Sequence, residues 1–494
     1  MKHFLLIPFL LITTLGCIAQ QTERAEEYTL VTYNIENLFD ADGISVFDDY
    51  KTKDRNGNDQ YTKEDVLTKI QNAIQVLKEY NDGKGPDIAV LVELESDFSK
   101  SDGVSYADAG DFLGRYSYTT IDKMLTSEFD EKVAGLPSEW LLLKGMVDAG
   151  MWNYQIEVGY SNRDENGEPE NVQKTAVFSR FPILKEKTKI HPLVRARPIL
   201  ETWIDVDGNE LVVFANHWKS GAGNADMEVL RLQNAEVLRA RLDELIEENP
   251  VVDFVLAGDF NSDYNQKARY EFEKTALDDV LGTHDTFNLW YNYPINKRGS
   301  DTYRGYWGTL MQIMISNSLM DASGISYVKD SFDRGDFGFN THSTSGEPKR
   351  WSSTFTGSGF SDHLPVSMRF SISNGSEVHI ESSAMAEEEW QPIPVTYEIP
   401  SEYLTEEEFF AEAPENQPEF FNEYFYLSAT VTEDYDFIVN GTTYDVYTPS
   451  FRLNEVLSEV KGTDIEIKFY GRFSQFRGNW QFVVEAPDFL IITE

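Results

Sequence analysis

Five short polar clusters border apolar stretches of the sequence, and their side chains are of the kinds that hold metal ions and transfer protons. The clusters are residues 34–37 (NIEN), 93–95 (ELE), 216–219 (NHWK), 259–261 (DFN) and 361–363 (SDH). Any one of them is more often a turn or a cap than a catalytic group. Together they supply amide and carboxylate oxygens, which suit Mg²⁺ or Mn²⁺ better than zinc, and two histidines. This combination predicts phosphoester hydrolysis assisted by a divalent cation.

The elements that must position these clusters are strands interleaved with helices. Apolar or β-branched runs predict strands at residues 28–33, 87–94, 175–179, 210–215, 251–257, 311–316 and 366–370. Helical periodicity is found at residues 62–80 and 226–248. Ligands gather at strand ends in α/β sheets, so a mixed α/β architecture would bring the clusters together.

The segments TYNIEN, VELE, NHWKS, AGDFN and FSDHLPV occur in this order and resemble the successive motifs of the endonuclease/exonuclease/phosphatase superfamily. That superfamily includes DNase I-like nucleases, sphingomyelinases and inositol polyphosphate phosphatases. Each motif alone is weak, but five in order form a strong pattern. The resemblance covers residues 28–370 and implies an α/β fold of the four-layer αββα sandwich type.

The resemblance also implies a role for each cluster. The metal site, for Mg²⁺ or Mn²⁺, would comprise Asn34, Glu36, Glu93 and Asp362. Asp259 and Asn261 would position the attacking water and hold the phosphate. His217 would polarise a phosphoryl oxygen, and His363 would act as general acid or base. Lys219 would contact the substrate, and Arg163 and Lys174 are further candidates for local positive charge.

One position departs from the family pattern. The superfamily usually places an Asp after the Leu that precedes the last active-site strand, where it orients the histidine of the SDH motif. Here Met311 follows Leu310, and a thioether can neither fix an imidazole tautomer nor stabilise its charge. Either Asp301 or Gln312 replaces the carboxylate, or the enzyme is slowed, or the domain has become a binding protein.

The first residues have the pattern of an export signal. Lys2 precedes an apolar run at residues 4–15, and residues 1–19 are predicted to be a signal peptide. Cys17, the only cysteine, lies where a lipobox would place a lipid-anchored cysteine, while cleavage after Ala19 is the alternative. The protein is therefore expected outside the cytoplasm: extracellular, periplasmic or on the outer-membrane surface. No later stretch is long enough for a transmembrane span.

The composition changes near the end of the predicted catalytic domain, residues 28–374. Residues 375–423 are rich in Glu, Pro and Ser and are predicted to be an acidic linker. Residues 424–494 alternate apolar and polar positions between turns, which predicts a small β-rich domain with the oligonucleotide/oligosaccharide-binding (OB) barrel as its candidate architecture.

These observations favour an extracellular nuclease, with nucleic acid or a small phosphoester as its partner and a monomeric state. The net charge of −42 weighs against this, because binding a phosphate backbone normally needs basic residues. A phosphatase or phosphodiesterase acting on phosphoinositides or other phospho-head groups, and a catalytically decayed binding protein, are the alternatives. The aromatic and cationic segment 288–306 suits base stacking, although ordinary packing is the favoured interpretation.

Overall fold

The computed structural model describes residues 26–97, 106–160, 164–166, 169–193, 195–282, 285–321, 323–352, 358–372, 392–411 and 420–493. The predicted signal peptide with Cys17, and also Arg163, lie outside the described residues. Within these ranges, no helix has the length and apolar character needed to cross a membrane.

The first of two mixed sheets has the strand order β13-β15-β1-β2-β4-β3, with β14 paired to β15. Its strands are β1 (Glu27–Leu38), β2 (Ile88–Glu95), β3 (Gln155–Val158), β4 (Gln173–Ser179), β13 (Ile325–Tyr327), β14 (Asp333–Arg334) and β15 (Val366–Ile372). The central strands β1 and β2 are parallel, so their polar C-terminal ends lie at the same edge.

The second sheet has the order β5-β6-β7-β8-β12-β9. Its strands are β5 (Lys189–His191), β6 (Ile199–Val206), β7 (Asn209–His217), β8 (Asp253–Asp259), β9 (Thr286–Asn288) and β12 (Met311–Ser316). Its central pair, β7 and β8, is also parallel. The predicted strands are confirmed, except that β1, β7 and β8 continue into the polar clusters that were expected to follow them, to Leu38, His217 and Asp259.

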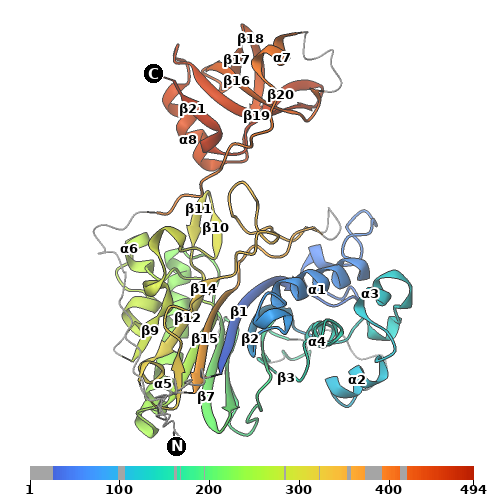
Figure 1. The fold of residues 1–494 in the computed structure, drawn as a ribbon, viewed down its shortest axis with the longest axis vertical. Helices are drawn as coiled ribbons and strands as arrows, with labels where there is room; N and C mark the ends of the chain where they lie inside the picture. The colour runs from blue at the N-terminus through green and yellow to red at the C-terminus, as the bar shows by residue number, and fades with distance from the viewer. Residues whose placement is uncertain are drawn as a thin grey trace, which may run out of the picture.

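Helices cover the outer faces of both sheets. They are α1 (Lys63–Leu77), α2 (Ala109–Arg115), α3 (Ile121–Lys123), α4 (Ser138–Asp148), α5 (Ala225–Glu248) and α6 (Gln266–Tyr270). Helix α1 starts at Thr62, whose hydroxyl and the carboxylate of Asp65 form a reciprocal capping box. Figure 1 shows α1 and α4 beside the first sheet and α5 beside the second.

Three hydrophobic cores hold these layers together. Along β2, Ile88 and Val90 face the core between the sheets, whereas Ala89 and Leu91 face the core under α1 and α4. The apolar side of α5 packs on β7 and β8 in a third core. A strand buried on both faces needs the continuous apolar run that the sequence has there. The observed layer order is helix, sheet, sheet, helix, as expected for an αββα sandwich.

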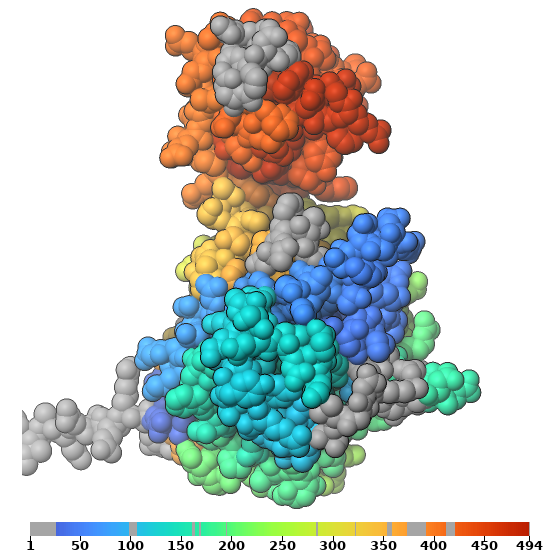
Figure 2. Space-filling view, turned by 90° about the vertical axis from the view of Figure 1, so that its right-hand side faces the viewer, coloured from blue at the N-terminus to red at the C-terminus, as the bar shows by residue number. Residues whose placement is uncertain are grey.

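The C-terminal domain is a small β-barrel around its own aromatic core. It contains β16 (Tyr424–Val431), β17 (Phe437–Val439), β18 (Thr442–Tyr447), α8 (Phe451–Val460), β19 (Ile467–Phe476), β20 (Asn479–Val483) and β21 (Leu490–Ile492). Pairing runs β16-β17-β18-β20-β19, and β19 closes onto β16. Figure 2 shows the barrel as a separate lobe, joined to the sandwich through residues near 300–350.

The described part of the predicted linker is attached to both domains. Helix α7 (Glu406–Ala411) places Phe409 in the barrel core. Val395 packs against Trp307 and Leu364 of the sandwich, and Trp307 donates its backbone N–H to Ile393 at 2.9 Å. The predicted domain boundaries remain predictions, but residues 392–411 contribute packed side chains rather than a bare connection.

Candidate active site

Four of the polar clusters meet where the central strands of the two sheets end. His217 and Asp259 are register partners on the parallel strands β7 and β8. Ligand atoms of Glu93, His217 and Asp259 all lie within 4.8 Å of one another. The buried amide of Asn34 joins the sheets by donating to Glu93 Oε1 at 3.0 Å and to Asp259 Oδ2 at 3.1 Å. Two carboxylates and an imidazole therefore converge on a candidate metal centre.

The backbone at the site is bent so that the side chains point into the cleft. Glu36, Asn37, Glu93 and Asn261 all have positive φ angles, between 48° and 67°. The register of β1 and β2 shifts at these positions. Left-handed backbone costs about 1 kcal/mol or more for a residue with a Cβ, and such residues concentrate at functional sites. The bulges re-aim the side chains that the sequence places at the strand ends.

Gly258 allows β8 to approach β7 immediately before Asp259. Its φ is +139°, and a Cβ built there would overlap the carbonyl oxygen of Asn216 on β7. Only glycine fits this combination of angle and contact. The register of His217 beside Asp259 depends on this close approach.

The two histidines have opposite charge states. Burial, reinforced by the nearby Arg197 and His363, lowers the pKa of His217 well below its usual value, so His217 is neutral. Burial also opposes the charge of His363, but Asp362, Asp259 and other acids outweigh it and raise the pKa of His363 well above its usual value. The neutral imidazole of His217 is therefore in the form that binds a metal ion, and the charged imidazole of His363 is in the form that donates a proton.

The carboxylates of the cleft repel one another. Burial and the charge of Asp362 raise the pKa of Glu93 to about 7. Burial raises the pKa of Asp259 as well. Burial would do the same to Asp362, but His363, whose Nδ1 lies 2.8 Å from Asp362 Oδ1, holds the pKa of Asp362 at about 2. A cation bound among these groups would relieve the repulsion.

Glu36 lies in a neighbouring cation-lined position rather than in the closest carboxylate group. It accepts hydrogen bonds from Arg350 Nε at 2.5 Å and from the backbone N–H of Trp351 at 2.9 Å. The buried Nζ of Lys69 donates to the Glu36 carbonyl oxygen, and burial lowers the pKa of Lys69 to about 8. Glu36 and Asp362 still interact electrostatically, so Glu36 borders the metal centre.

In place of the expected aspartate, Asp362 Oδ1 lies 2.8 Å from His363 Nδ1, and Asp301 on another strand adds negative charge nearby. Asp301, in β10 (Asp301–Tyr303), forms an isolated β-bridge with His363. Its carboxylate is buried, and the charges of Asp301 and His363 shift each other's pKa. Gln312 is excluded from this role, because its amide donates to Ser262 and its oxygen accepts from Asn288.

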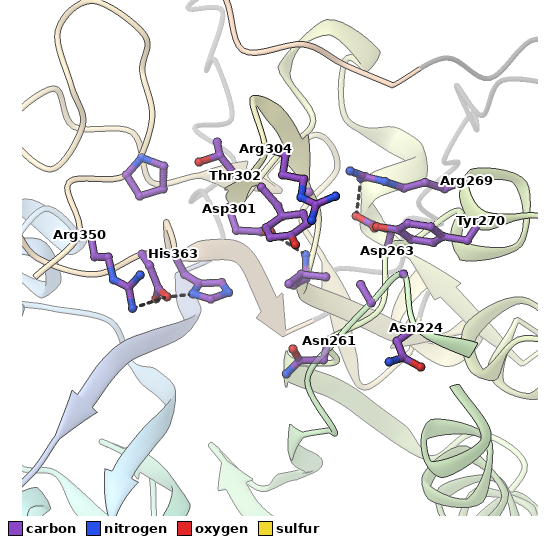
Figure 3. A pocket seen from close by; sticks show the side chains of 18 residues that line it. Asn224, Asn261, Asp263, Arg269, Tyr270, Asp301, Thr302, Arg304, Arg350 and His363 are labelled. Carbon is purple, nitrogen blue, oxygen red and sulfur yellow. Dashed lines mark hydrogen bonds and ion pairs between the residues drawn. The ribbon is translucent and has the colours of Figure 1, made fainter. Parts of the chain in front are cut away.

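A cavity of about 790 Å³ opens beside these groups. His363, Asp362 and Asn261 line one part of it, and Arg269, paired with Asp263 at 2.9 Å, lines another. Figure 3 shows Arg304 and Asp301 between these two sets. The cavity thus leads from residues that neighbour the candidate metal centre to a rim that carries several arginines, and Glu93, His217 and Asp259 themselves do not line it.

Two of the predicted cations do not reach the cavity. Lys219 is not among the residues that line it. Lys174 is buried and pairs with Glu139 at 2.8 Å, on the far side of β4. The two arginines of the aromatic segment 288–306 have different surroundings. Arg298 is fully buried and donates hydrogen bonds to Tyr264, Tyr291 and Tyr293, as ordinary packing predicts. Arg304 lines the cavity.

Sequence reasoning missed three cations that face the acidic groups: Lys69, Arg197 and Arg350. Arg197 precedes β6, donates to the Trp218 carbonyl at 3.1 Å and acts on the charges of Glu93 and Asp259. Lys69 lies within the apolar stripe of α1, where a buried lysine without a nearby acid would be costly. That mismatch was the one signal available in the sequence.

Residues 153–371 match the model of the Endonuclease/Exonuclease/phosphatase family. This segment holds the NHWKS, AGDFN and FSDHLPV clusters, three of the five motifs that carry the resemblance. Among curated proteins, none matches the sequence.

Solved structures with a similar fold include a truncated TDP2 of Caenorhabditis elegans, at 14% identity and a TM-score of 0.37, covering 70% of this chain and 97% of that one. A TDP2 of D. rerio, complexed with a single strand DNA product, has 11% identity and a TM-score of 0.38, covering 70% and 98%. An endonuclease/exonuclease/phosphatase family protein of Bacteroides thetaiotaomicron has 14% identity and a TM-score of 0.38, covering 72% and 99%.

Proposed function

We propose that this protein is a Mg²⁺- or Mn²⁺-dependent phosphodiester hydrolase whose substrate is nucleic acid. The observation that carries the proposal is the convergence of Glu93, His217 and Asp259 within 4.8 Å, next to a positively charged His363. Burying two carboxylates this close together is unfavourable unless a cation or a proton compensates them.

The residues present fit a divalent cation. Glu93 and Asp259 offer oxygen atoms, and Nε2 of His217 faces both, 3.7 Å from Glu93 Oε1 and 3.9 Å from Asp259 Oδ2. Asp362, Glu36 and Asn34 surround this group and would complete or orient its ligands. When bound, the cation would stabilise negative charge on the phosphoryl oxygens. The oxygen-rich set favours Mg²⁺ or Mn²⁺ over softer metals.

The protein's own groups are arranged for proton transfer. The backbone N–H of Asn261 donates to Asp259 Oδ1 at 2.8 Å and Asn34 donates to the other oxygen, so the Asp259 carboxylate is held in one orientation. It would orient a water molecule for attack on phosphorus. Nε2 of His363 is buried without a hydrogen-bond partner among the described residues and lies 3.7 Å from Asp259. It is available to donate a hydrogen bond or a proton to a phosphoryl oxygen.

Two features support nucleic acid over a small phosphorylated head group. The cavity rim combines arginines with exposed aromatic rings, which suits phosphates and bases together. The barrel pairs its strands in the order first-second-third-fifth-fourth and closes onto the first, with α8 between the third and fourth. A closed five-stranded barrel of this kind is the architecture of the OB fold, which binds oligonucleotides and oligosaccharides.

We further propose that the protein acts outside the cytoplasm as a monomer. The support is the pattern of residues 1–19 and the acidic composition of the chain. Cys17 would then be either a lipid attachment site or part of a removed signal. Labelling cells with a radioactive fatty acid and comparing wild type with Cys17→Ala separates these two outcomes.

The test of the activity uses the full-length chain with Mg²⁺, Mn²⁺ or chelator on plasmid DNA, RNA and phosphoinositide or sphingomyelin head groups. Asp259→Asn is compared with Asp253→Asn, because both aspartates lie on β8 but at opposite ends. We expect metal-dependent cleavage of nucleic acid, reduced at least about 10³-fold in Asp259→Asn and unchanged in Asp253→Asn. If the protein instead cleaves a phosphorylated head group preferentially, that head group replaces nucleic acid as the proposed substrate. Absence of metal-dependent turnover on every substrate would refute the hydrolase.

A further inference from the structure

The hairpin of β10 and β11 (Tyr306–Gly308) extends from the candidate active site to the barrel. Asp301, Thr302, Tyr303 and Arg304 of this hairpin line the same cavity as His363. Figure 3 shows Arg304 between the His363 side of the cavity and the Arg269 side. At its turn, the hairpin contacts α8 of the barrel, because the Cβ position of Gly305 lies against Arg452. The hairpin therefore connects residues that line the cavity with the first turn of a helix in the barrel.

Arg304 is held by rings instead of by an acid. Its guanidinium carbon lies 5.1 Å from the ring centre of Tyr303 and 5.0 Å from that of Phe451, the first residue of α8. No carboxylate of the described residues forms an ion pair with it, in contrast to Arg269 and Arg350 at the same cavity, which pair with acids. In a chain of net charge −42, a cation left without an acidic partner at a cavity mouth is unusual.

The rings that hold Arg304 are open to solvent. Tyr303 is 66% exposed and Phe451 is 51% exposed. Exposed aromatic rings keep a free face for stacking, and a guanidinium ordered between rings keeps its N–H groups for an oxyanion. Tyr303, Arg304 and Phe451, called here the rim triad, thus present one phosphate-binding group flanked by two stacking surfaces.

The rim triad is not needed to attach the barrel to the sandwich, because other groups already join the two domains. Arg452 Nη1 donates to the carbonyl of Val395 at 2.7 Å, and its guanidinium lies 5.3 Å from the ring centre of Tyr306. The backbone N–H of Val395 donates to Gly305 at 2.8 Å. These contacts join the hairpin, the connecting segment and α8 without using the donors of Arg304.

We propose that the rim triad is a binding site for the nucleotide next to the scissile phosphate, in single-stranded nucleic acid. Arg304 would bind the flanking phosphate, and Tyr303 and Phe451 would stack on unpaired bases. Single strands fit better than duplex, because paired bases do not offer their faces to protein rings. This inference rests on the proposed function, whose substrate it narrows to single strands or frayed ends.

The test measures binding separately from hydrolysis. A labelled oligonucleotide of about eight nucleotides is titrated, by fluorescence anisotropy, with Asp259→Asn protein carrying Tyr303→Ala, Arg304→Ala or neither. Arg477→Ala is the matched control. Arg477 also follows an exposed aromatic residue and precedes a glycine in a hairpin turn, with a φ of 51° against 53° for Arg304 and the same 5.1 Å distance to the preceding ring. It does not line the cavity.

We expect Tyr303→Ala and Arg304→Ala each to raise the Kd for the single strand about tenfold, with Arg477→Ala within about twofold of the parent. Three results would each overturn the proposed role of the rim triad: unchanged Kd values in its variants, an equal loss of affinity in Arg477→Ala, or a duplex that binds as tightly as the single strand. Hydrolysis of bis(4-nitrophenyl) phosphate, which carries no nucleotide, reports on the proposed function alone. If the wild-type protein lacks that activity while the rim variants still weaken binding, the proposed hydrolase activity is refuted and the proposed binding site is supported.

Discussion

The pKa of Glu93 leads to a quantitative prediction about metal binding. Burial and the charge of Asp362 raise this pKa from 4.5 to about 7, and a metal ion must displace the proton wherever Glu93 is protonated. Without the shift, Glu93 would be about 90% ionised at pH 5.5, and affinity would change only about 1.1-fold between pH 8 and pH 5.5. With it, the ionised fraction falls from about 0.9 to about 0.03 over the same interval, so the affinity falls about 30-fold.

The assay is isothermal titration calorimetry with Mn²⁺ at about pH 8 and about pH 5.5, in two buffers of different ionisation enthalpy at each pH. Close to one proton should be released per ion bound at the lower pH and close to none at the higher pH. Glu93→Gln should weaken binding at pH 8 and flatten the remaining pH dependence. His217 is neutral across this interval because burial lowers its pKa, so it does not contribute competing protons.

Glu95 is the matched control for this prediction. It lies two residues further along β2, is buried, and has a pKa that burial raises to about 8. Its carboxylate accepts from the backbone N–H of Asp40 at 2.9 Å and lies outside the Glu93, His217 and Asp259 group. Glu95→Gln should leave the Mn²⁺ affinity and its pH dependence unchanged. An affinity that stays within about threefold between the two pH values would refute the reasoning.

Three further outcomes are expected. Asp301→Asn should lower kcat on a small diester about 10²-fold with little change in KM, and Met311→Asp in that background should recover part of it; an unchanged kcat would exclude Asp301 as the group that positions the histidine. Burial raises the pKa of Asp253 to about 6, so the protein has its full stability at acid pH, where Asp253 is protonated, and loses part of it as the pH rises through 6. Asp253→Asn should therefore raise the free energy of unfolding by up to about 3 kcal/mol at pH 8 but not at pH 4, as measured in thermal melts. Gly258→Ala should destabilise by about 3 kcal/mol in urea unfolding, because its Cβ would overlap Asn216; a midpoint like that of wild type would contradict this.

The sequence was sufficient for the layers and for most of the strand ends. The alternation of core sides along β2 and the apolar stripe of α1 are local signals, so periodicity alone predicts the elements that carry Glu93 and Lys69. Ligands gather at strand ends in α/β sheets, and this is why the clusters that contain His217 and Asp259 could be expected near each other, although their register pairing could not. The backbone conformation at the strand ends could not be predicted, because the bulges at Asn34 and Glu93 depend on contacts between strands far apart in sequence.

The cations of the site could not be predicted, for a related reason. Lys174 and Lys219 lie near motifs in sequence, but proximity in sequence does not fix the direction of a side chain, and Lys174 points to Glu139. Arg350, by contrast, lies 314 residues from Glu36 and is brought to it by the fold. A pair of this kind is visible only once the chain reversals between them are known.

The replacement of the expected aspartate by Met311 shows which property of the site the fold preserves. Met311 is the register partner of Asp259 on β12 and is buried in the core between the sheets. The carboxylate beside His363 Nδ1 is that of Asp362, and further negative charge comes from Asp301 on the neighbouring hairpin, whose backbone forms a bridge with that histidine. An imidazole responds to the charge and acceptor near it, not to the strand that provides them. The backbone bridge to Asp301 ties the histidine to the hairpin that carries the rim triad, so that the group expected to donate a proton and the group expected to hold the flanking nucleotide are positioned by the same element.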